Sequence, residues 1–422
     1  MIIKAKYIAV FLFVSISAGC CMHYPMNPDY NGPLPLPETI KKEYEYKKFT
    51  GEYQVAILEK KEEYIIKQIE FAPSHNILPT THNVTVDYYD INKKKSPVIM
   101  VLPILGGSNK IAKSFADYFA RHGYAAVIVH RQKEYKKLEQ INKLDETLRQ
   151  IVFDHKQAID WIMTQENLDS EKIGIFGVSM GGIKSSLVSA LDSRISASVM
   201  VLAAGDLPYI LTYSREKGII KRRKKIMAQE NLRLDEFHRK LQRAVKCDPI
   251  NYAEYLDARK VLMVLAKFDN VVPYRKGKEL GDKIGKPETI VLFSGHYTAI
   301  PFIFYVKKKS LQFFRKKFGF SDQIVLKQKC YFKRCVWENL VVEHSYRGVL
   351  PRNIAEVKGI PGKEIYRSGH LQPEFIPGLL KLGIKSIVTL SSVSEKTRDL
   401  LKAHGIRHEE FDFSSEKMTF EG

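Results

Sequence analysis

IGIFGVSMGG, residues 173–182, is the stretch that decides the fold, because an apolar run there ends in a serine flanked by glycines. Ile173 to Phe176 predicts a buried strand, and the residues that follow predict a helix. A tight turn between strand and helix holds Ser179 in a strained backbone conformation, and side chains two residues to either side would collide with the neighbouring strand and helix. Gly177 and Gly181 remove those side chains. The sequence therefore predicts that Ser179 projects above a sheet at the N-terminus of a helix.

Strands and helices alternate on both sides of this turn. Helical spacing of apolar residues is found at 110–122 and again around Leu148 to Ile162. Buried parallel strands separated by amphipathic helices predict an α/β fold with a doubly wound, mostly parallel sheet. The strands expected in it are 98–102, 125–129, 173–176, 197–202, 261–266 and 289–293. Shorter runs rich in Val, Ile and Tyr predict antiparallel edge strands at 52–58, 64–71 and 83–89.

Two more polar residues follow strands of this sheet. Asp269 comes just after the strand 261–266, and His296, beside Gly295, comes just after the strand 289–293. The carboxyl ends of parallel strands meet at one edge, so these residues and Ser179 are expected to come together there. A serine hydroxyl needs a general base, and the base needs an acid that fixes its tautomer. The prediction is Ser179 as nucleophile, His296 as base and Asp269 as the orienting acid, with no cofactor.

On these motifs, residues 40–318 resemble the α/β-hydrolase superfamily, and look most like its dienelactone-hydrolase-like and prolyl-peptidase-like bacterial esterase members. The resemblance implies that Ser179 attacks an ester, thioester or amide carbonyl of a small-molecule acyl substrate, and that water resolves the acyl-enzyme. It also implies an oxyanion hole made by the backbone N–H of Met180 and of a residue on the loop after the strand 98–102. Leu105 is the expected second donor, with Ile104 and Gly106 as alternatives, since the His-Gly pair of many members is missing there.

Two other residues at strand ends are alternatives for the site. His130 follows the strand 125–129 and can line a substrate cleft, although histidine at a strand end is commonly structural or solvated. Asp206 follows the strand 197–202 and is an alternative acid. Both acids fit the chain order Ser, acid, His, and Asp269 is preferred because its sequence context is sharper. No His/Cys/Asp/Glu cluster has metal-ligand spacing, so metal catalysis is not expected.

The N-terminal sequence predicts that the protein is exported. Lys4 and Lys6 precede the apolar run 7–16, and small residues stand before Cys20, as in a signal peptide. The pattern resembles the lipobox of bacterial lipoproteins, which implies lipidation of Cys20 and, since Asp does not follow it, an outer-membrane location facing the periplasm. Cys21 leaves open which thiol is modified, and an ordinary secretory signal is the alternative. The proline-rich segment 21–39 predicts an extended, poorly ordered tether.

The charge balance is strongly basic, since 67 Lys and Arg against 47 Asp and Glu give +20. A helical insertion at about 206–246 is expected to form a cap over the site, and it carries 12 cations against 5 acids, including the run Lys221 to Lys225. The stretch 307–334 has 10 cations and one acid. Such runs are commonly solvated helix faces, but they also fit attraction to anionic headgroups or acidic substrates. Nucleic-acid binding is not expected, because no recognised nucleic-acid module is present.

A second region is expected after a basic linker at 319–350. Residues 351–422, with Tyr366-Arg367-Ser368-Gly369 and the strand 386–390, resemble the first half of a tyrosine or dual-specificity phosphatase-like domain. The His-Cys-x5-Arg loop that makes that family catalytic is missing, because no cysteine lies beyond Cys335. A small, incomplete α/β region of low stability is therefore expected. Cys330 and Cys335 can close a disulfide loop or remain free thiols.

The sequence thus predicts a membrane-anchored serine hydrolase that cleaves a carboxylic ester or related acyl substrate. Two alternatives remain: a catalytically silent surface lipoprotein that binds an acidic ligand, and a phosphatase-type protein if the natural chain is longer.

Overall fold

The computed structural model describes residues 21–78, 83–104, 109–130, 141–320, 355–360, 363–367, 376, 386–389 and 393–410. The chain forms two compact units, residues 1–320 with 420–422 and residues 321–419. Among the described residues, no helix is both long and apolar enough to cross a membrane.

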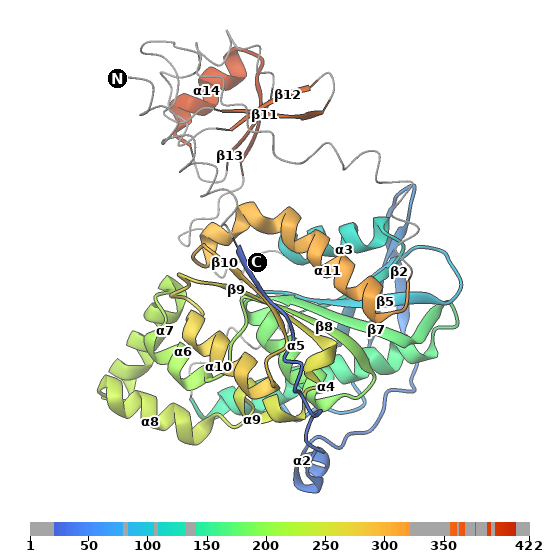
Figure 1. Cartoon of the computed structure of the whole chain (residues 1–422), viewed down its shortest axis with the longest axis vertical. Coiled ribbons are helices and arrows are strands. Elements are labelled where there is room, and N and C mark those ends of the chain that lie inside the picture. Colours follow the sequence, from blue (N-terminus) through green and yellow to red (C-terminus); the bar gives the residue numbers. More distant parts are fainter. Residues whose placement is uncertain are drawn as a thin grey trace. The chain divides into compact units, whose positions relative to one another are not determined.

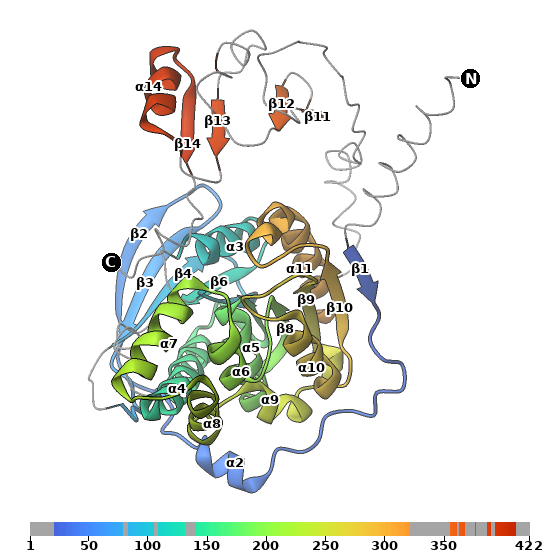
Figure 2. The same ribbon diagram turned by 90° about the vertical axis from the view of Figure 1, so that its left-hand side faces the viewer.

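The first unit is built on a ten-stranded sheet with the order β1-β10-β9-β8-β7-β5-β6-β4-β3-β2 (Figures 1 and 2). The six strands from β10 to β6 in this order are parallel to their neighbours. β1 is antiparallel to β10 at one edge, and β4, β3 and β2 continue antiparallel from β6 at the other. The sheet is therefore mostly parallel, as predicted. The strands are β1 (Cys21–Tyr24), β2 (Gln54–Lys60), β3 (Ile65–Phe71), β4 (Val84–Asp90), β5 (Ser96–Leu102), β6 (Ala125–Val129), β7 (Leu168–Val178), β8 (Ile195–Val201), β9 (Val261–Ala266) and β10 (Glu288–Leu292).

Helices cover both faces of this sheet (Figure 1). One face carries α3 (Lys110–Arg121) and α11 (Ile303–Lys317), and the other carries α4 (Asn142–Thr164), α5 (Met180–Leu191) and α10 (Tyr274–Ile284). The predicted insertion forms α6 (Leu207–Tyr213), α7 (Lys217–Gln229) and α8 (Leu234–Ala244). The short elements are α2 (Glu38–Glu43), α9 (Pro249–Tyr252), η2 (Ala253–Tyr255), η3 (Ala258–Lys260) and η4 (Tyr297–Phe302).

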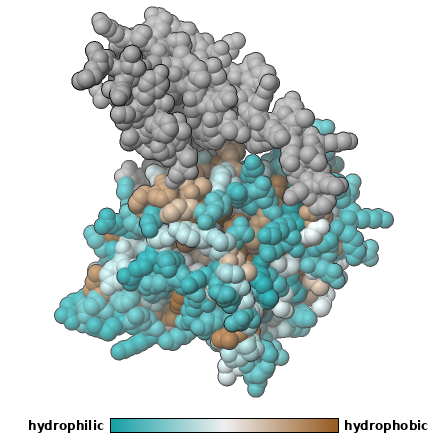
Figure 3. Space-filling view, in the orientation of Figure 1, coloured by the Kyte–Doolittle hydropathy of each residue, from teal (hydrophilic) through white to brown (hydrophobic). Residues whose placement is uncertain are grey.

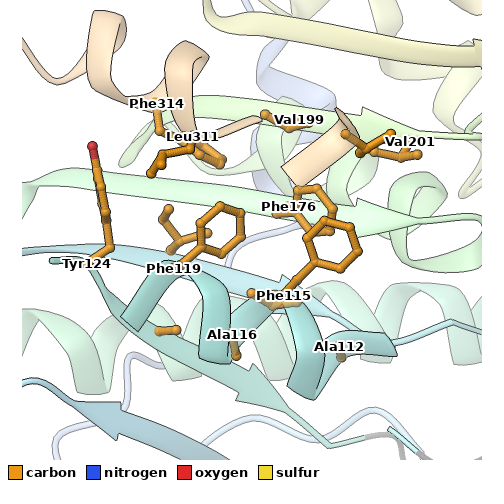
Figure 4. Close-up of a cluster of buried hydrophobic side chains, with 14 of the residues drawn as sticks. Ala112, Phe115, Ala116, Phe119, Tyr124, Phe176, Val199, Val201, Leu311 and Phe314 are labelled. Carbon is orange, nitrogen blue, oxygen red and sulfur yellow. The ribbon is translucent and has the colours of Figure 1, made fainter. Parts of the chain in front are cut away.

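An aromatic cluster joins α3 and α11 to the strand that leads to Ser179 (Figure 4). Phe115 of α3 packs on Phe176 of β7 with ring centroids 4.2 Å apart, and Phe119 lies 5.7 Å from Phe314 of α11. Phe115, Phe119, Phe176 and Phe314 are each 2 % exposed or less. Burying a side chain of this size stabilises the fold by about 1.5–3 kcal/mol, so the cluster fixes β7 firmly beneath the turn that follows it.

The other face contains a buried histidine that should make stability depend on pH. His155 of α4 is 4 % exposed, and its Nδ1 lies 2.6 Å from the Ile151 carbonyl oxygen. Burial, together with the positive charge of Lys184, lowers the pKa of His155 to about 3. The unfolded chain therefore binds a proton below pH 6.5 that the folded chain rejects, and stability falls as the pH falls towards 3.

Replacing this histidine is expected to flatten the pH dependence. Wild type should lose about 1.4 kcal/mol of stability per pH unit below 6.5 through His155, or about 2 kcal/mol at pH 5. His155→Leu should lose that part of the slope. Urea unfolding at pH 7, 6 and 5, followed by the fluorescence of Trp161 in the same helix, measures it, and equal slopes in the two proteins would contradict the assignment.

Residues 21–37 differ from the predicted tether. They are extended, but β1 adds to the edge of the sheet through pairing of Cys21 with Leu292 and of Tyr24 with Thr289. Further on, Tyr30 Oη donates to the Leu256 carbonyl, and the Leu34 N–H donates to that of Glu254 at 2.9 Å. The prolines prevent helix formation but do not prevent strand pairing in the four residues before them, and sequence composition misses this distinction.

The second unit contains two small sheets among its described residues. β11 (Ala355–Ile360) and β12 (Lys363–Arg367) pair antiparallel, and β13 (Ser386–Thr389) pairs parallel with β14 (Arg407–Glu410). Between the last two lies α14 (Glu395–Ala403), capped by the Ser394 side chain. The predicted strand 386–390 corresponds to β13. The Ser368-Gly369 turn, Cys330 and Cys335 lie outside the described residues, and the resemblance to a phosphatase-like domain stays a prediction.

Candidate active site

Ser179 stands between β7 and α5 in a strained backbone conformation. Its φ of 55° and ψ of −120° place it in a left-handed region that costs a non-glycine residue free energy, and the structure matches the prediction from the sequence. Its N–H donates to the Val201 carbonyl oxygen of β8 at 2.8 Å, and its carbonyl accepts from Ile183 at 3.0 Å. These bonds hold the serine at the N-terminus of α5, at the carboxyl edge of the parallel strands.

The glycines on either side are required by close backbone contacts. A Cβ at Gly177 would lie 2.2 Å from the carbonyl carbon and oxygen of Gly181. A Cβ at Gly181 would lie 2.2 Å from the Leu102 carbonyl oxygen at the end of β5. Both distances are far below van der Waals contact, so the predicted reason for these glycines is confirmed.

Gly177→Ala is therefore expected to destabilise the protein severely. The added methyl meets backbone atoms that cannot move independently of α5, and the expected cost is about 4 kcal/mol or more. Gly295→Ala is a matched control, because its Cβ would come no closer than 3.4 Å to any atom. Thermal unfolding followed by circular dichroism should show a large loss for the first variant and little for the second. Equal melting temperatures would contradict the packing argument.

Asp269 and His296 meet after β9 and β10. His296 Nδ1 lies 2.6 Å from Asp269 Oδ2, and the two side chains are 10 % and 1 % exposed. The other carboxylate oxygen, Oδ1, accepts the backbone N–H groups of Val271 and Val272 at 2.9 Å each. A carboxylate accepts hydrogen bonds, so Nδ1 carries the hydrogen in this pair and Nε2 remains free to accept a proton.

Backbone hydrogen bonds tie the two loops that carry this pair. Lys267 N–H donates to the Leu292 carbonyl oxygen at 2.8 Å, and Phe268 N–H donates to that of Ser294 at 2.9 Å. Within the described residues, no hydrogen bond joins Ser179 Oγ to His296. Such bonds are commonly long in the absence of substrate and tighten when it binds. The structure thus brings the acid and the base into contact, and places Ser179 on the same edge of the sheet.

Of the two predicted oxyanion donors, Met180 lies within the described residues and Leu105 does not. Met180 is the first residue of α5, so its N–H has no partner within the helix and is available at the positive end of the helix dipole. Leu105 and Gly106 lie outside the described residues. The loop that carries them begins beside the serine turn, since a Cβ at Gly181 would lie 3.2 Å from the Pro103 carbonyl oxygen.

The alternative site residues have other partners. Asp206 caps α6 by accepting the Tyr209 N–H, and forms an ion pair of 2.8 Å with Lys276. His130 Nε2 lies 2.8 Å from Oδ1 of the buried Asp87 on β4. The observed partner of His296 is Asp269, as predicted, so Asp206 is not the acid of this pair.

The helical insertion is bonded to both loops of the site, which sequence reasoning did not find. Arg215 N–H donates to the Asn270 carbonyl oxygen at 3.1 Å, one residue after Asp269. The Tyr297 hydroxyl, one residue after His296, donates to the Glu216 carboxylate. Burial and the Glu216 charge raise the pKa of Tyr297. The only signal for this contact is a tyrosine next to the candidate base, and no local pattern names its partner 81 residues away.

The contact between Tyr297 and Glu216 should be measurable as a coupling energy. Hydrogen bonds to charged groups contribute about 1.5–3 kcal/mol. In a double-mutant cycle, Tyr297→Phe and Glu216→Gln should each destabilise the protein, and their effects should fall short of additivity by about 1.5 kcal/mol. Urea unfolding of the four proteins measures this quantity. Strict additivity would mean that the two side chains act independently.

Part of the chain is similar to one known protein family, and the chain is similar to several solved structures. Residues 86–216 match the sequence model of the family described as Dienelactone hydrolase family. No curated protein sequence matched the chain. Among solved structures, the acetyl xylan esterase from Paenibacillus sp. R4 is 15 % identical, with 65 % of this chain and 99 % of that chain covered and a TM-score of 0.48. Acetyl xylan esterase 1 from Thermoanaerobacterium sp. JW/SL YS485 is 17 % identical over 67 % and 99 %, with a TM-score of 0.47.

The order of strands and site residues defines the class of fold. A serine turn follows β7, a carboxylate follows β9 and a histidine follows β10, in a mostly parallel sheet with helices on both faces. This arrangement is that of the α/β-hydrolase fold, and the family match over residues 86–216 agrees with it. Within the described ranges, no group of three or more His, Cys, Asp or Glu side chains is arranged to hold a metal ion.

Proposed function

We propose that the protein is a serine hydrolase that cleaves a carboxylic ester or related acyl substrate. The observation that carries the proposal is the 2.6 Å contact between His296 Nδ1 and the buried Asp269, on the edge of the sheet where Ser179 is held in its strained turn. Backbone strain at a residue other than glycine is commonly found where a side chain must be presented to a ligand.

In the proposed mechanism, Ser179 Oγ attacks the acyl carbonyl while His296 Nε2 takes its proton. The Met180 N–H donates to the developing oxyanion, together with an N–H from the loop after β5, for which Leu105 is the proposed donor. His296 then gives the proton to the leaving alcohol. Water, deprotonated by the same nitrogen, attacks the acyl-enzyme; the bond to Ser179 Oγ breaks, the acid leaves, and His296 returns the proton to Oγ. Asp269 holds the imidazole in the tautomer that each step needs.

Export and anchoring are part of the proposal. Cys20 is the proposed lipidation site, which would tether the enzyme to a bacterial membrane, the outer membrane by its sequence pattern. The thiol of Cys21 already donates to the Tyr305 hydroxyl at 3.4 Å, and its residue begins β1. This engagement favours Cys20 over Cys21 as the modified residue.

The substrate class is tested by comparing an acyl ester with a phosphate ester. The full chain should hydrolyse a short-chain aryl ester and be inactivated by a fluorophosphonate, and it should leave an aryl phosphate intact. Turnover of the phosphate alone would favour the phosphatase alternative, and silence on every substrate would favour a surface lipoprotein that only binds its ligand.

A further inference from the structure

Three exposed phenylalanines lie on the segments that carry the candidate acid and base. Phe268 directly precedes Asp269 and is 63 % exposed, and Phe293 follows β10 and is 41 % exposed. Their ring centroids lie 6.3 Å apart. Phe304, at the start of α11, is 79 % exposed. These three residues are called the aromatic rim. On the face shown in Figure 3, which is mostly hydrophilic, an apolar patch lies where the chain passes from β10 into α11.

The segment that carries most of the aromatic rim has a one-sided charge. Residues 289–321 contain no Asp or Glu and six Lys or Arg. The ammonium group of Lys309 lies 5.7 Å from the centre of the Tyr305 ring, so a cation and an aromatic ring are in contact near the start of α11. Exposed aromatic rings combined with cations are typical of surfaces that enter the interface of an anionic bilayer.

The N-terminal end of the described chain emerges at the same edge. Because β1 runs antiparallel to β10, Cys21 lies opposite Leu292, one residue before Phe293. Cys21, Phe302, Ile303 and Tyr305 all pack against the same buried cluster. The sequence before Cys21 has the apolar run 7–16 and contains no acid. Whether that segment is retained or replaced by a lipid on Cys20, any membrane anchor there joins the protein next to the aromatic rim.

We propose that the aromatic rim is a membrane-docking surface. It places the catalytic edge of the sheet against an anionic phospholipid bilayer, so that the substrate is an ester presented at the lipid surface. The inference about substrate rests on the proposed hydrolase function, whereas the docking itself does not. The anchor and the rim act on one edge of the fold, so a short connection is enough for both to contact the same bilayer.

Docking is tested by tryptophan fluorescence of the full chain. Phe304→Trp and Ile57→Trp are prepared and reconstituted in vesicles of phosphatidylglycerol and phosphatidylethanolamine with brominated or ordinary acyl chains. Ile57 is a matched control, because it is 56 % exposed on β2 at the opposite edge of the sheet (Figure 2). Trp161 and Trp337 contribute the same background to both variants. We expect brominated lipid to quench Phe304→Trp beyond that background and to leave Ile57→Trp unchanged.

Kinetics on the same vesicles test the substrate class. Phe304→Asp should lower turnover of a bilayer-embedded long-chain ester by roughly tenfold, since an apolar anchor is replaced by a charge that anionic lipid repels. It should leave turnover of a soluble short-chain ester unchanged, as should Ile57→Asp with either substrate.

Three results would overturn the proposal. Equal quenching of Phe304→Trp and Ile57→Trp would mean that the rim does not define the docked face, and quenching of neither would mean that the rim stays in water. A blue shift of Phe304→Trp that needs no vesicles and grows with protein concentration would assign the rim to contact between copies of the chain. If soluble ester turnover persists in these cases, the hydrolase proposal stands and only the docking fails.

Discussion

Ser179→Ala is expected to reduce ester turnover by roughly 10⁴- to 10⁶-fold, because the nucleophile is lost while binding and the oxyanion donors remain. The fold should be unaffected, since alanine adopts the same backbone with one atom fewer and the contacts of Ser179 to Val201 and Ile183 are made by the main chain. Steady-state hydrolysis of an aryl ester measures the loss, with circular dichroism to show that the variant folds.

Ser189→Ala is the matched control for this variant. Ser189 lies on the same helix, and its hydroxyl bonds to Ser198 and not to any residue of the candidate site. Its replacement should change turnover by less than about threefold. A Ser179→Ala protein that keeps a tenth or more of wild-type activity would assign the nucleophile to another group.

Asp269→Asn is expected to lower kcat by roughly 10⁴-fold through the tautomer of His296. Two backbone N–H groups, from Val271 and Val272, donate to Oδ1. An asparagine keeps its oxygen in that position, because its NH₂ group there would face two donors. The NH₂ group then points at His296 Nδ1, which must become the acceptor, so Nε2 carries the proton and cannot take one from Ser179.

A second variant tests whether Asp269, and not the alternative acid, orients His296. Asp206→Asn tests the alternative acid, and it should keep nearly full activity because asparagine also caps helices well. An Asp269→Asn enzyme within tenfold of wild type would exclude Asp269 as the orienting acid.

The sequence was sufficient for those parts of the fold whose signals are local. The run 173–176 with its glycines predicted the strand, turn and helix around Ser179, and strands 261–266 and 289–293 predicted where Asp269 and His296 stand. Parallel strands that end at one edge bring such residues together whatever the details of the helices between them. The pairing of Asp269 with His296 follows from this geometry.

The features that were missed depend on contacts distant in sequence. Strand β1 lies within a proline-rich composition, and its pairing with β10 is encoded by the exposed edge of a strand more than 260 residues later. The contact of Tyr297 with Glu216 and the exposure of Phe304 likewise depend on how the insertion and α11 pack. Hydrophobic residues are normally predicted to be buried, so an exposed phenylalanine beside a candidate site is found only in three dimensions.

Peptide mass spectrometry of a fluorophosphonate adduct on the full chain tests whether Ser179 is the nucleophile. One covalent adduct is expected, on the Ser179 oxygen with loss of fluoride, and its rate of formation should decrease strongly in His296→Ala. An adduct on another residue, or rapid ester turnover by a protein that forms no adduct, would contradict the assignment of Ser179 as nucleophile.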